Sequence, residues 1–519
     1  MTNLTAGDGK MPRSIAILLS PELRYFLIDL ARDLKQRTGA DIHGYVATEQ
    51  EITFYQTNSE EGLFDSLSNA ERDVRNPPAT PDSAELFEEA AIWERKIGTT
   101  FARLAVSHRH FGRGYALAGS GHPRSRLSES FDLARMTRAY VMQCRFWENE
   151  FATRSIDLVI NGGTTVSLMA KRHGAFHRAI LGSRIENLHF WAQDSHFYTS
   201  EVESKFYAEP AADVETAELL RPYMVERTHR QIFKNKSSLF RLIQEAGVMI
   251  ARRAYHHLRG YEKARGYYLT EELKFIGRRW LDTRRMTDQR TLTLSQLAGK
   301  PFIFFPLHTE PEASVGQASP EFFFQHAAIA AISRDLPAGY LLAVKETIHG
   351  VGRRPRDFYT QVADLKNVVW LNMMEYGLDV VRDATAVATI TGTAGMEAAV
   401  IGKPVISFGR HNIYNFLDHV FDVADITDLS IPIRAITQVG VDLAQARRDG
   451  ARYIRAVTST SFDMRDYNYV NLKKFQKTSV TDAVTSLSAS LPTFSRFASE
   501  EENATEPNTM DASGSNIDA

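Results

Sequence analysis

The chain has 519 residues, of which 43% are hydrophobic and 24% are charged, and its formal net charge is −2. This length is more than one hydrophobic core normally supports and predicts two large domains, while the near-neutral charge argues against a dedicated nucleic-acid-binding protein. Cys144 is the only cysteine, which excludes an intramolecular disulfide and a zinc site made of paired cysteines.

No run of apolar residues approaches the roughly 18 that a membrane-spanning helix needs, and the polar first residues do not resemble a signal peptide. We therefore expect a cytoplasmic protein. Changes in composition along the chain predict four segments. They are a first α/β domain over 1–220, a basic helical connector over 221–295, a second α/β domain over 296–490 and a disordered acidic tail over 491–519.

The first domain begins with a strand, a helix and a second strand. Residues 15–20 form a short apolar run, apolar residues recur at helical spacing over 23–34, and residues 41–47 are apolar again. This order predicts a βαβ unit and hence a parallel sheet. Ligands of such sheets bind beyond the carboxyl ends of the strands, which places Glu22 at the edge of a candidate site.

Three histidines, His108, His110 and His122, lie in a predicted loop over 107–126. No carboxylate lies at the spacing of a metal ligand, and arginines are interleaved with the histidines. An anion-binding or simply solvated loop is therefore favoured over a metal site.

A polar turn follows the apolar run over 156–160. A helix is predicted after it, so the turn should lie at the carboxyl end of a strand. We expect the turn to line the cleft from the side of the first domain. Its residues are Asn161, Gly162, Gly163 and Thr164.

The connector differs in composition from both domains. Residues 221–290 contain 17 Lys and Arg against 7 Asp and Glu, with aromatic residues in between and helical periodicity throughout. A solvated linker is the plain interpretation. The alternative is a surface for anionic lipid headgroups or another anionic polymer. RNA is disfavoured because no RNA-binding motif is present.

Strands and helices alternate regularly in the second domain and predict a doubly wound sheet. The five apolar strands are expected over 301–306, 339–344, 368–371, 387–391 and 405–408. The helices between them are expected over 320–334, 356–364, 375–384 and 394–401. Terminal helices are expected over 441–457 and about 480–490.

A glycine-bearing turn joins the fourth of these strands to a short helix. Gly392 and Gly395 are expected to turn the backbone and leave room for a ligand at the helix N-terminus, whose free N–H groups suit a phosphate. Glu397 is expected in the first helical turn, where the helix dipole stabilises a carboxylate that can accept hydrogen bonds from sugar hydroxyls. An ordinary strand–helix–strand unit, in which the glycines only make turns, is the plain alternative.

Three stretches of sequence resemble the bacterial capsule polysaccharide biosynthesis family, which includes the β-Kdo transferases of capsule export. They are Phe304-Phe-Pro-Leu-His-Thr-Glu-Pro-Glu-Ala-Ser-Val315, Thr391-Gly-Thr-Ala-Gly-Met-Glu-Ala398 and Gly402-Lys-Pro-Val-Ile-Ser-Phe-Gly409. The resemblance covers about residues 300 to 425, and only the architecture of the first half fits. Members that transfer Kdo tend to carry a His-Pro pair after the second strand of this domain, where this chain has Lys345-Glu-Thr-Ile-His-Gly350. The resemblance therefore implies no particular donor sugar.

The resemblance implies a GT-B glycosyltransferase that moves a sugar from a nucleotide-sugar donor to a surface-polysaccharide or glycolipid acceptor, without a metal or other cofactor. The implied donor-binding residues are Lys345, Arg353, Thr391, Gly392, Thr393, Ala394, Gly395 and Glu397. The candidate catalytic residues are Glu22 as a general base and His308 and Glu310 beyond the first strand of the second domain. The acceptor is expected against Asn161 to Thr164.

Two other functions fit the same pattern. A sugar-nucleotide 2-epimerase shares the fold and the core of the glycine motif but uses no acceptor. A polysaccharide-binding or assembly protein would bind glycan and turn over no donor. For the transferase we expect association with the inner face of the cell membrane through residues 221–290 and no nucleic-acid partner.

Overall fold

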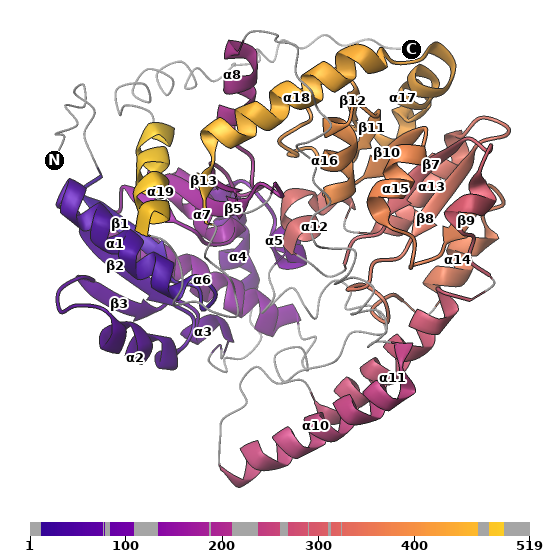
Figure 1. Ribbon diagram of the computed structural model, residues 1–519. Helices are drawn as coiled ribbons and strands as arrows, with labels where there is room; N and C mark the ends of the chain where they lie inside the picture. Colours follow the sequence, from indigo (N-terminus) through magenta and orange to yellow (C-terminus); the bar gives the residue numbers. More distant parts are fainter. Residues whose placement is uncertain are drawn as a thin grey trace, which may run out of the picture.

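The computed structural model shows two α/β domains and a helical hairpin (Figure 1). It describes residues 12–75, 77, 84–107, 133–185, 188–209, 237–259, 268–288, 290–309, 313–322, 324–355, 357–464 and 477–491. The predicted histidine loop, the acidic tail and Glu310 lie outside these residues, apart from residue 107 and residue 491.

The first sheet has seven strands in the order β13-β6-β5-β4-β1-β2-β3. Strands β3, β2, β1, β4 and β5 are parallel, and β6 runs antiparallel to β5. The strands are β1 (Ser14–Leu18), β2 (Asp41–Val46), β3 (Ser66–Asn69), β4 (Leu158–Ile160), β5 (Phe176–Gly182) and β6 (Leu188–Ala192). The predicted βαβ unit at 15–47 is confirmed by the parallel register of β1 with β2.

Helices cover both faces of this sheet, because its central strands are apolar on both sides. Ile15 and Ile17 pack on the face of α1 and α19, whereas Ala16 packs on the opposite face with α4, α6 and α7. The helices of the first domain are α1 (Arg24–Thr38), α2 (Glu49–Asn58), α3 (Arg72–Arg75), α4 (Ala84–Ile97), α5 (Phe101–Ser107), α6 (Leu133–Arg154), α7 (Thr164–Arg172) and α8 (Glu201–Ala208).

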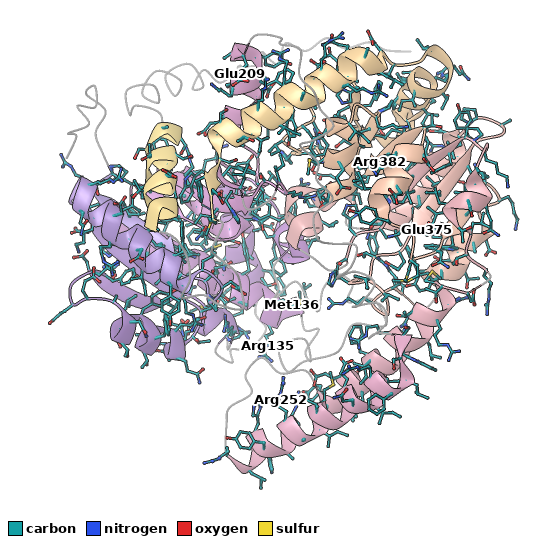
Figure 2. The ribbon with its side chains drawn as sticks, viewed as in Figure 1. Arg135, Met136, Glu209, Arg252, Glu375 and Arg382 are labelled. Atoms are coloured by element: carbon teal, nitrogen blue, oxygen red, sulfur yellow. The ribbon has the colours of Figure 1, made fainter. Side chains whose placement is uncertain are left out.

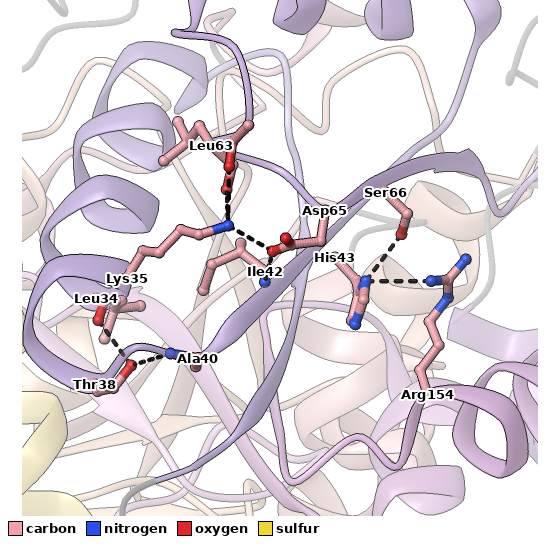
Figure 3. Close-up of polar contacts among 11 residues, drawn as sticks. Leu34, Lys35, Thr38, Ala40, Ile42, His43, Leu63, Asp65, Ser66 and Arg154 are labelled. Carbon is pink, nitrogen blue, oxygen red and sulfur yellow. Dashed lines mark hydrogen bonds and ion pairs between the residues drawn. The ribbon is translucent and has the colours of Figure 1, made fainter.

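Strand β3 lies in a polar stretch that the sequence does not mark as a strand. Side-chain contacts tie it to the sheet (Figure 3). Lys35 Nζ donates to Asp65, 2.7 Å away, and Asp65 in turn accepts from the backbone N–H of Ile42 at 2.7 Å. His43 Nδ1 lies 2.9 Å from Ser66 Oγ. The edge strand is thus specified by tertiary contacts and not by an apolar pattern.

The second sheet has six parallel strands in the order β12-β11-β10-β7-β8-β9. The predicted doubly wound sheet is confirmed, and β12 is one strand more than predicted. Its strands are β7 (Phe302–Pro306), β8 (Leu341–Lys345), β9 (Val368–Leu371), β10 (Ala386–Thr389), β11 (Val405–Ser407) and β12 (Val420–Asp422).

Successive residues of the central strand β7 alternate between the two faces of this sheet. Ile303 and Phe305 pack with α13 and α14, and Phe302 and Phe304 pack on the opposite face with α15, α16 and α18. The helices are α12 (Ala313–Ala318), α13 (Gln325–Asp335), α14 (Phe358–Asp364), α15 (Gly377–Asp383), α16 (Thr393–Val400), α17 (Ser430–Arg434) and α18 (Leu443–Thr460). Two Rossmann-type domains of this kind form a GT-B-like fold.

The end of the chain returns to the first domain. Strand β13 (Phe462–Asp463) pairs antiparallel with β6, and α19 (Lys477–Ser490) packs against α1. Trp191 Nε1 donates to the backbone oxygen of Ala483 at 2.9 Å. The helix predicted near 480–490 therefore exists but belongs to the core of the first domain, because its apolar residues Val480 and Val484 are buried there.

The described part of the connector is a helical hairpin of α10 (Leu239–Leu258) and α11 (Leu269–Arg285). It extends away from the two sheets (Figure 1). The C-terminal part of α11 is anchored on the second domain, where Arg278 Nη2 donates to the backbone oxygen of Arg354 at 2.6 Å. Among the described helices, none combines the length and the apolar character that crossing a membrane requires.

Candidate functional site

His308 is the centre of a buried network at the carboxyl edge of the second sheet. Its Nε2 accepts from the backbone N–H of Thr391 at 3.1 Å, so Nδ1 carries the proton and donates to Gln325 Oε1 at 3.2 Å. The backbone oxygen of His308 accepts from Gln325 Nε2 at 3.0 Å and from Arg354 Nη2 at 2.6 Å. Both ring nitrogens are therefore engaged in positioning the turn that follows β10.

Burial lowers the pKa of His308 to about 3, and the nearby charges of Arg184 and Arg354 lower it further, whereas the hydrogen bond to Gln325 opposes the shift. The imidazole is thus neutral at physiological pH. We propose that His308 holds Thr391 in place and does not itself exchange a proton with a substrate.

This pKa gives a testable dependence of stability on pH. The unfolded chain binds a proton at His308 below about pH 6.5 and the folded chain does not, so stability is retained above pH 6.5 and is lost as the pH falls. The loss from this group amounts to about 2 kcal/mol between pH 6.5 and pH 5. We expect the melting temperature of the wild type to fall more over this interval than that of His308→Gln, whose amide oxygen can still accept from Thr391. Equal acid shifts in the two proteins would contradict this account of His308.

Glycine is required at these two positions of the turn for a different reason from the one predicted. A Cβ at Gly392 would lie 2.8 Å from His308 Nε2, and one at Gly395 would lie 2.3 Å from Thr389 Cγ2 and 2.6 Å from Tyr414 OH. The space beside both glycines is therefore filled by the protein's own side chains. The glycines let this network pack against the backbone, and they do not themselves leave room for a ligand.

Glu397 lies in the second turn of α16, because the helix begins at Thr393. The expected placement in the first turn is wrong, and the support of the helix dipole decreases beyond that turn. Burial raises the pKa of Glu397, and the charges of Arg184 and Arg382 only partly oppose this shift. Its carboxylate makes no hydrogen bond with a described residue. It is an acceptor to which no described residue donates, and it is not among the residues that line the cavity formed by Arg184, Thr391 and Met396.

Arg184 of the first domain reaches this region. It follows β5 with a left-handed backbone (φ 67°) that is uncommon for a residue with a side chain. It lines a cavity of about 280 Å³ together with Thr391 and Met396 of the second domain. Its charge acts on Glu397 and His308. Nothing in the sequence around Arg184 marks it as a site residue.

Three buried hydroxyl groups line the same cavity without a hydrogen-bond partner among the described residues. They belong to Thr391, Tyr414 and Tyr453, whose side chains are at most 3% exposed. An unpaired buried hydroxyl costs about 1–3 kcal/mol. A ligand with hydrogen-bonding groups would recover this cost, which makes the cavity a candidate binding site.

The cavity lies where the two domains touch. The rings of His196 in the first domain and His411 in the second stack with centroids 4.1 Å apart and an angle of 5° between their planes. His196 Nδ1 also lies 2.9 Å from the backbone oxygen of Gln317, and Arg103 forms an ion pair with Glu321. Both domains therefore contribute to one site.

Lys345 and Arg353, the cations expected at the donor site, lie on the β8 side of the sheet. The neighbouring Arg354 is completely buried and pairs with Glu346 at 2.7 Å, so its role is structural. The guanidinium of Arg353 lies 5.6 Å from the ring centre of Phe275 in the hairpin. Burial lowers the pKa of Lys345 to about 8, which leaves it mostly protonated at neutral pH. Lys345 and Arg353 are not among the residues that line the cavity with Arg184.

A second cavity, of about 380 Å³, lies at the carboxyl edge of the first sheet. It is lined by Asn161, Gly162, Gly163 and Thr164, as expected for this turn, and by Gln317 of the second domain. Asn161 Nδ2, Thr164 Oγ1 and Gln317 Nε2 have no hydrogen-bond partner among the described residues. The cavity is otherwise mainly apolar, with Trp147 and Tyr45 in its wall.

Glu22 does not line this cavity. It is exposed in the turn between β1 and α1. The carboxylate in the wall of the cavity is Glu71, with Oε2 3.6 Å from Arg75 Nε. Within the described residues, no group of three or more His, Cys, Asp or Glu side chains is placed to share a metal ion.

Residues 215–417 match the family model described as "Capsule polysaccharide biosynthesis protein". The predicted resemblance to this family is confirmed over that part of the chain, which contains the hairpin and most of the second domain. No curated protein matches the chain.

Solved structures with a similar fold include transferases and epimerases. The β-Kdo 2,7 transferase of Thermosulfurimonas dismutans KpsC is 13% identical over 66% of this chain and 89% of that chain, with a TM-score of 0.30. The KpsC β-Kdo 2,4 transferase is 11% identical over 57% of this chain and 79% of that chain, with a TM-score of 0.27. A UDP-GlcNAc 2-epimerase from Methanocaldococcus jannaschii is 12% identical over 86% and 99%, with a TM-score of 0.23. Likeness at this level carries no argument about activity.

Proposed function

We propose that this chain, which matches the capsule polysaccharide biosynthesis family over residues 215–417, is a glycosyltransferase that uses a nucleotide-sugar donor. Its acceptor is a glycan or a lipid-linked glycan of a surface polysaccharide. The observation that carries the proposal is a cavity lined by Arg184 and by three hydroxyls that lack a partner among the described residues, with Glu397 near enough for its carboxylate to interact with the charge of Arg184.

The chemistry of a nucleotide sugar fits the groups at this edge. A ribose offers hydroxyl donors to the carboxylate of Glu397, which lacks one among the described residues. A phosphate offers negative charge to the guanidinium of Arg184 and to the backbone N–H groups at the start of α16. In a transfer reaction the leaving phosphate gains charge, and fixed cations and N–H groups that stabilise this charge lower the barrier.

We propose that the acceptor binds in the cavity of the first domain. The groups of this cavity that lack a partner among the described residues are the amide nitrogens of Asn161 and Gln317 and the hydroxyl of Thr164. Among the described residues, no lysine or arginine lines this cavity. Neutral amide and hydroxyl groups against an apolar wall with Trp147 suit an uncharged sugar ring better than a phosphate.

A thermal-shift screen of nucleotides and nucleotide sugars tests this function. A ligand at a hundred times its Kd adds about 2.7 kcal/mol of apparent stability. We expect a nucleoside diphosphate or monophosphate to raise the melting temperature. The free sugar alone should have no effect. If no nucleotide shifts the melting temperature at any concentration, the proposal of a nucleotide-sugar site fails.

A further inference from the structure

Helix α10 presents an apolar face that no other described part of the chain covers. Sixteen large apolar side chains are exposed in the described part of the chain, and seven of them lie on this one helix. Its exposed apolar residues are Leu239, Phe240, Ile243, Val248, Ile250, Tyr255 and Leu258. Exposed apolar residues scattered singly are normal, but a concentration of this kind marks an interaction surface.

Four of these seven residues lie on one stripe along the helix, and Val248 and Tyr255 lie outside it. Phe240, Ile243, Gly247, Ile250 and Leu258 follow one another with Ala254 at spacings of three or four positions, so they share one side of α10. Phe240 is 73% exposed and Leu258 is 84% exposed. The side of α10 that faces α11 is a separate one, made of less exposed residues such as Leu242 and Met249.

A row of arginines runs along another side of the same helix. Arg241, Arg252 and Arg259 are separated by eleven and seven positions, which is about three and two helical turns. All three are exposed and none forms an ion pair with a described residue. Figure 2 shows Arg252 on α10, in the hairpin.

The only acidic residue of α10 is Glu245, and it is already neutralised. Its carboxylate pairs with Arg279 of α11 at 2.5 Å, and Arg253 pairs across the hairpin with Glu272 at 3.0 Å. Trp280 Nε1 donates to the backbone oxygen of Ser237 at 3.0 Å and fixes the start of α10. The hairpin therefore holds a helix whose outer surface is apolar and cationic.

We propose that α10 docks on an anionic lipid surface, with the stripe of Phe240, Ile243, Ile250 and Leu258 in the interfacial region and the arginines against the headgroups. A helix that lies in a membrane interface combines an apolar face with a cationic polar face in this way. A second copy of the chain is the less suitable occupant, because two hairpins of the same positive charge would repel each other. The proposal is independent of the glycosyltransferase function, although it would bring a lipid-linked acceptor to the protein.

Flotation of the full-length protein with lipid vesicles tests the proposal. We expect flotation with vesicles of phosphatidylcholine and phosphatidylglycerol and much less with phosphatidylcholine alone. Replacing Phe240 and Leu258 together by Ser should weaken binding about tenfold, because large apolar side chains would leave the lipid. Each change of Arg241 or Arg252 to Gln should weaken binding to the anionic vesicles about fivefold.

The matched control is the pair Ile431→Ser and Val439→Ser in the second domain, whose side chains are 62% and 84% exposed. Binding of this variant should equal that of the wild type, and the melting temperatures of all variants should agree, since every changed side chain is exposed. Equal binding to neutral and anionic vesicles, or loss of binding in the control variant, would overturn the proposal. So would a dimer in sedimentation that the Phe240 and Leu258 changes abolish, combined with no vesicle binding.

Discussion

Replacing Glu397 by Ala is expected to weaken nucleotide binding about ten- to hundredfold and to leave the melting temperature of the free protein unchanged or higher. A hydrogen bond to a charged group contributes about 1.5–3 kcal/mol, and the carboxylate of Glu397 has no donor among the described residues until a ligand supplies one. Burial raises its pKa, which means that the charged form is disfavoured in the folded protein. Removal of the charge therefore relieves the fold while it removes the acceptor.

Isothermal titration with the nucleotide found by thermal shift measures this effect. Glu397→Gln should lose less affinity than Glu397→Ala, because the amide oxygen still accepts one bond. Asp364→Asn, at an exposed carboxylate of α14 in the same domain, is the matched control and should bind as the wild type does. If Glu397→Ala binds nucleotide as tightly as the wild type does, the turn over residues 391–397 has only a structural role.

Replacing Arg184 by Ala should weaken binding of a nucleotide about tenfold or more and leave binding of the corresponding nucleoside unchanged. The guanidinium is placed to meet phosphate, and charge-assisted bonds of this kind are about twice as strong as neutral ones. Arg184→Gly should have the same loss of affinity with a higher melting temperature than Arg184→Ala, because glycine adopts the left-handed backbone at φ 67° without strain.

Arg382 provides the matched control for Arg184. Its charge also acts on Glu397, but from α15 and outside the residues that line the cavity. Arg382→Ala should therefore change nucleotide affinity little. If Arg184→Ala lowers the affinities for nucleotide and nucleoside equally, Arg184 stabilises the contact between the domains and does not bind phosphate.

The second domain is the part of the fold that its sequence predicts best. Its strands are short apolar runs separated by helical periods, and a parallel sheet buried on both faces requires such runs. Strands β3, β6, β12 and β13 have no comparable pattern, because each lies toward an edge of its sheet and depends on a partner that is distant in the chain. The return of α19 to the first domain rests on contacts such as Trp191 with Ala483, which no local pattern reveals.

The site, like the fold, has features that the local sequence predicts and features that depend on distant residues. The turn after a strand and the start of a helix are local features, so Thr391 to Glu397 and Asn161 to Thr164 could be placed at the two sheet edges. Their detailed roles depend on residues far away. His308 fills the space beside Gly392, and the first domain supplies Arg184 to a cavity of the second. Arg184, Tyr414 and Tyr453 therefore could not be predicted from motifs.

Product analysis by mass spectrometry tests the central claim most directly. The full-length protein is incubated with the nucleotide sugar selected by thermal shift and with a lipid-linked oligosaccharide acceptor. We predict that the acceptor gains the mass of one glycosyl unit and that an equal amount of free nucleotide is released, and that Glu397→Ala slows both. An isomer of the nucleotide sugar formed without release of nucleotide would identify an epimerase, and a bound donor with no turnover would identify a binding protein; either result would contradict the account.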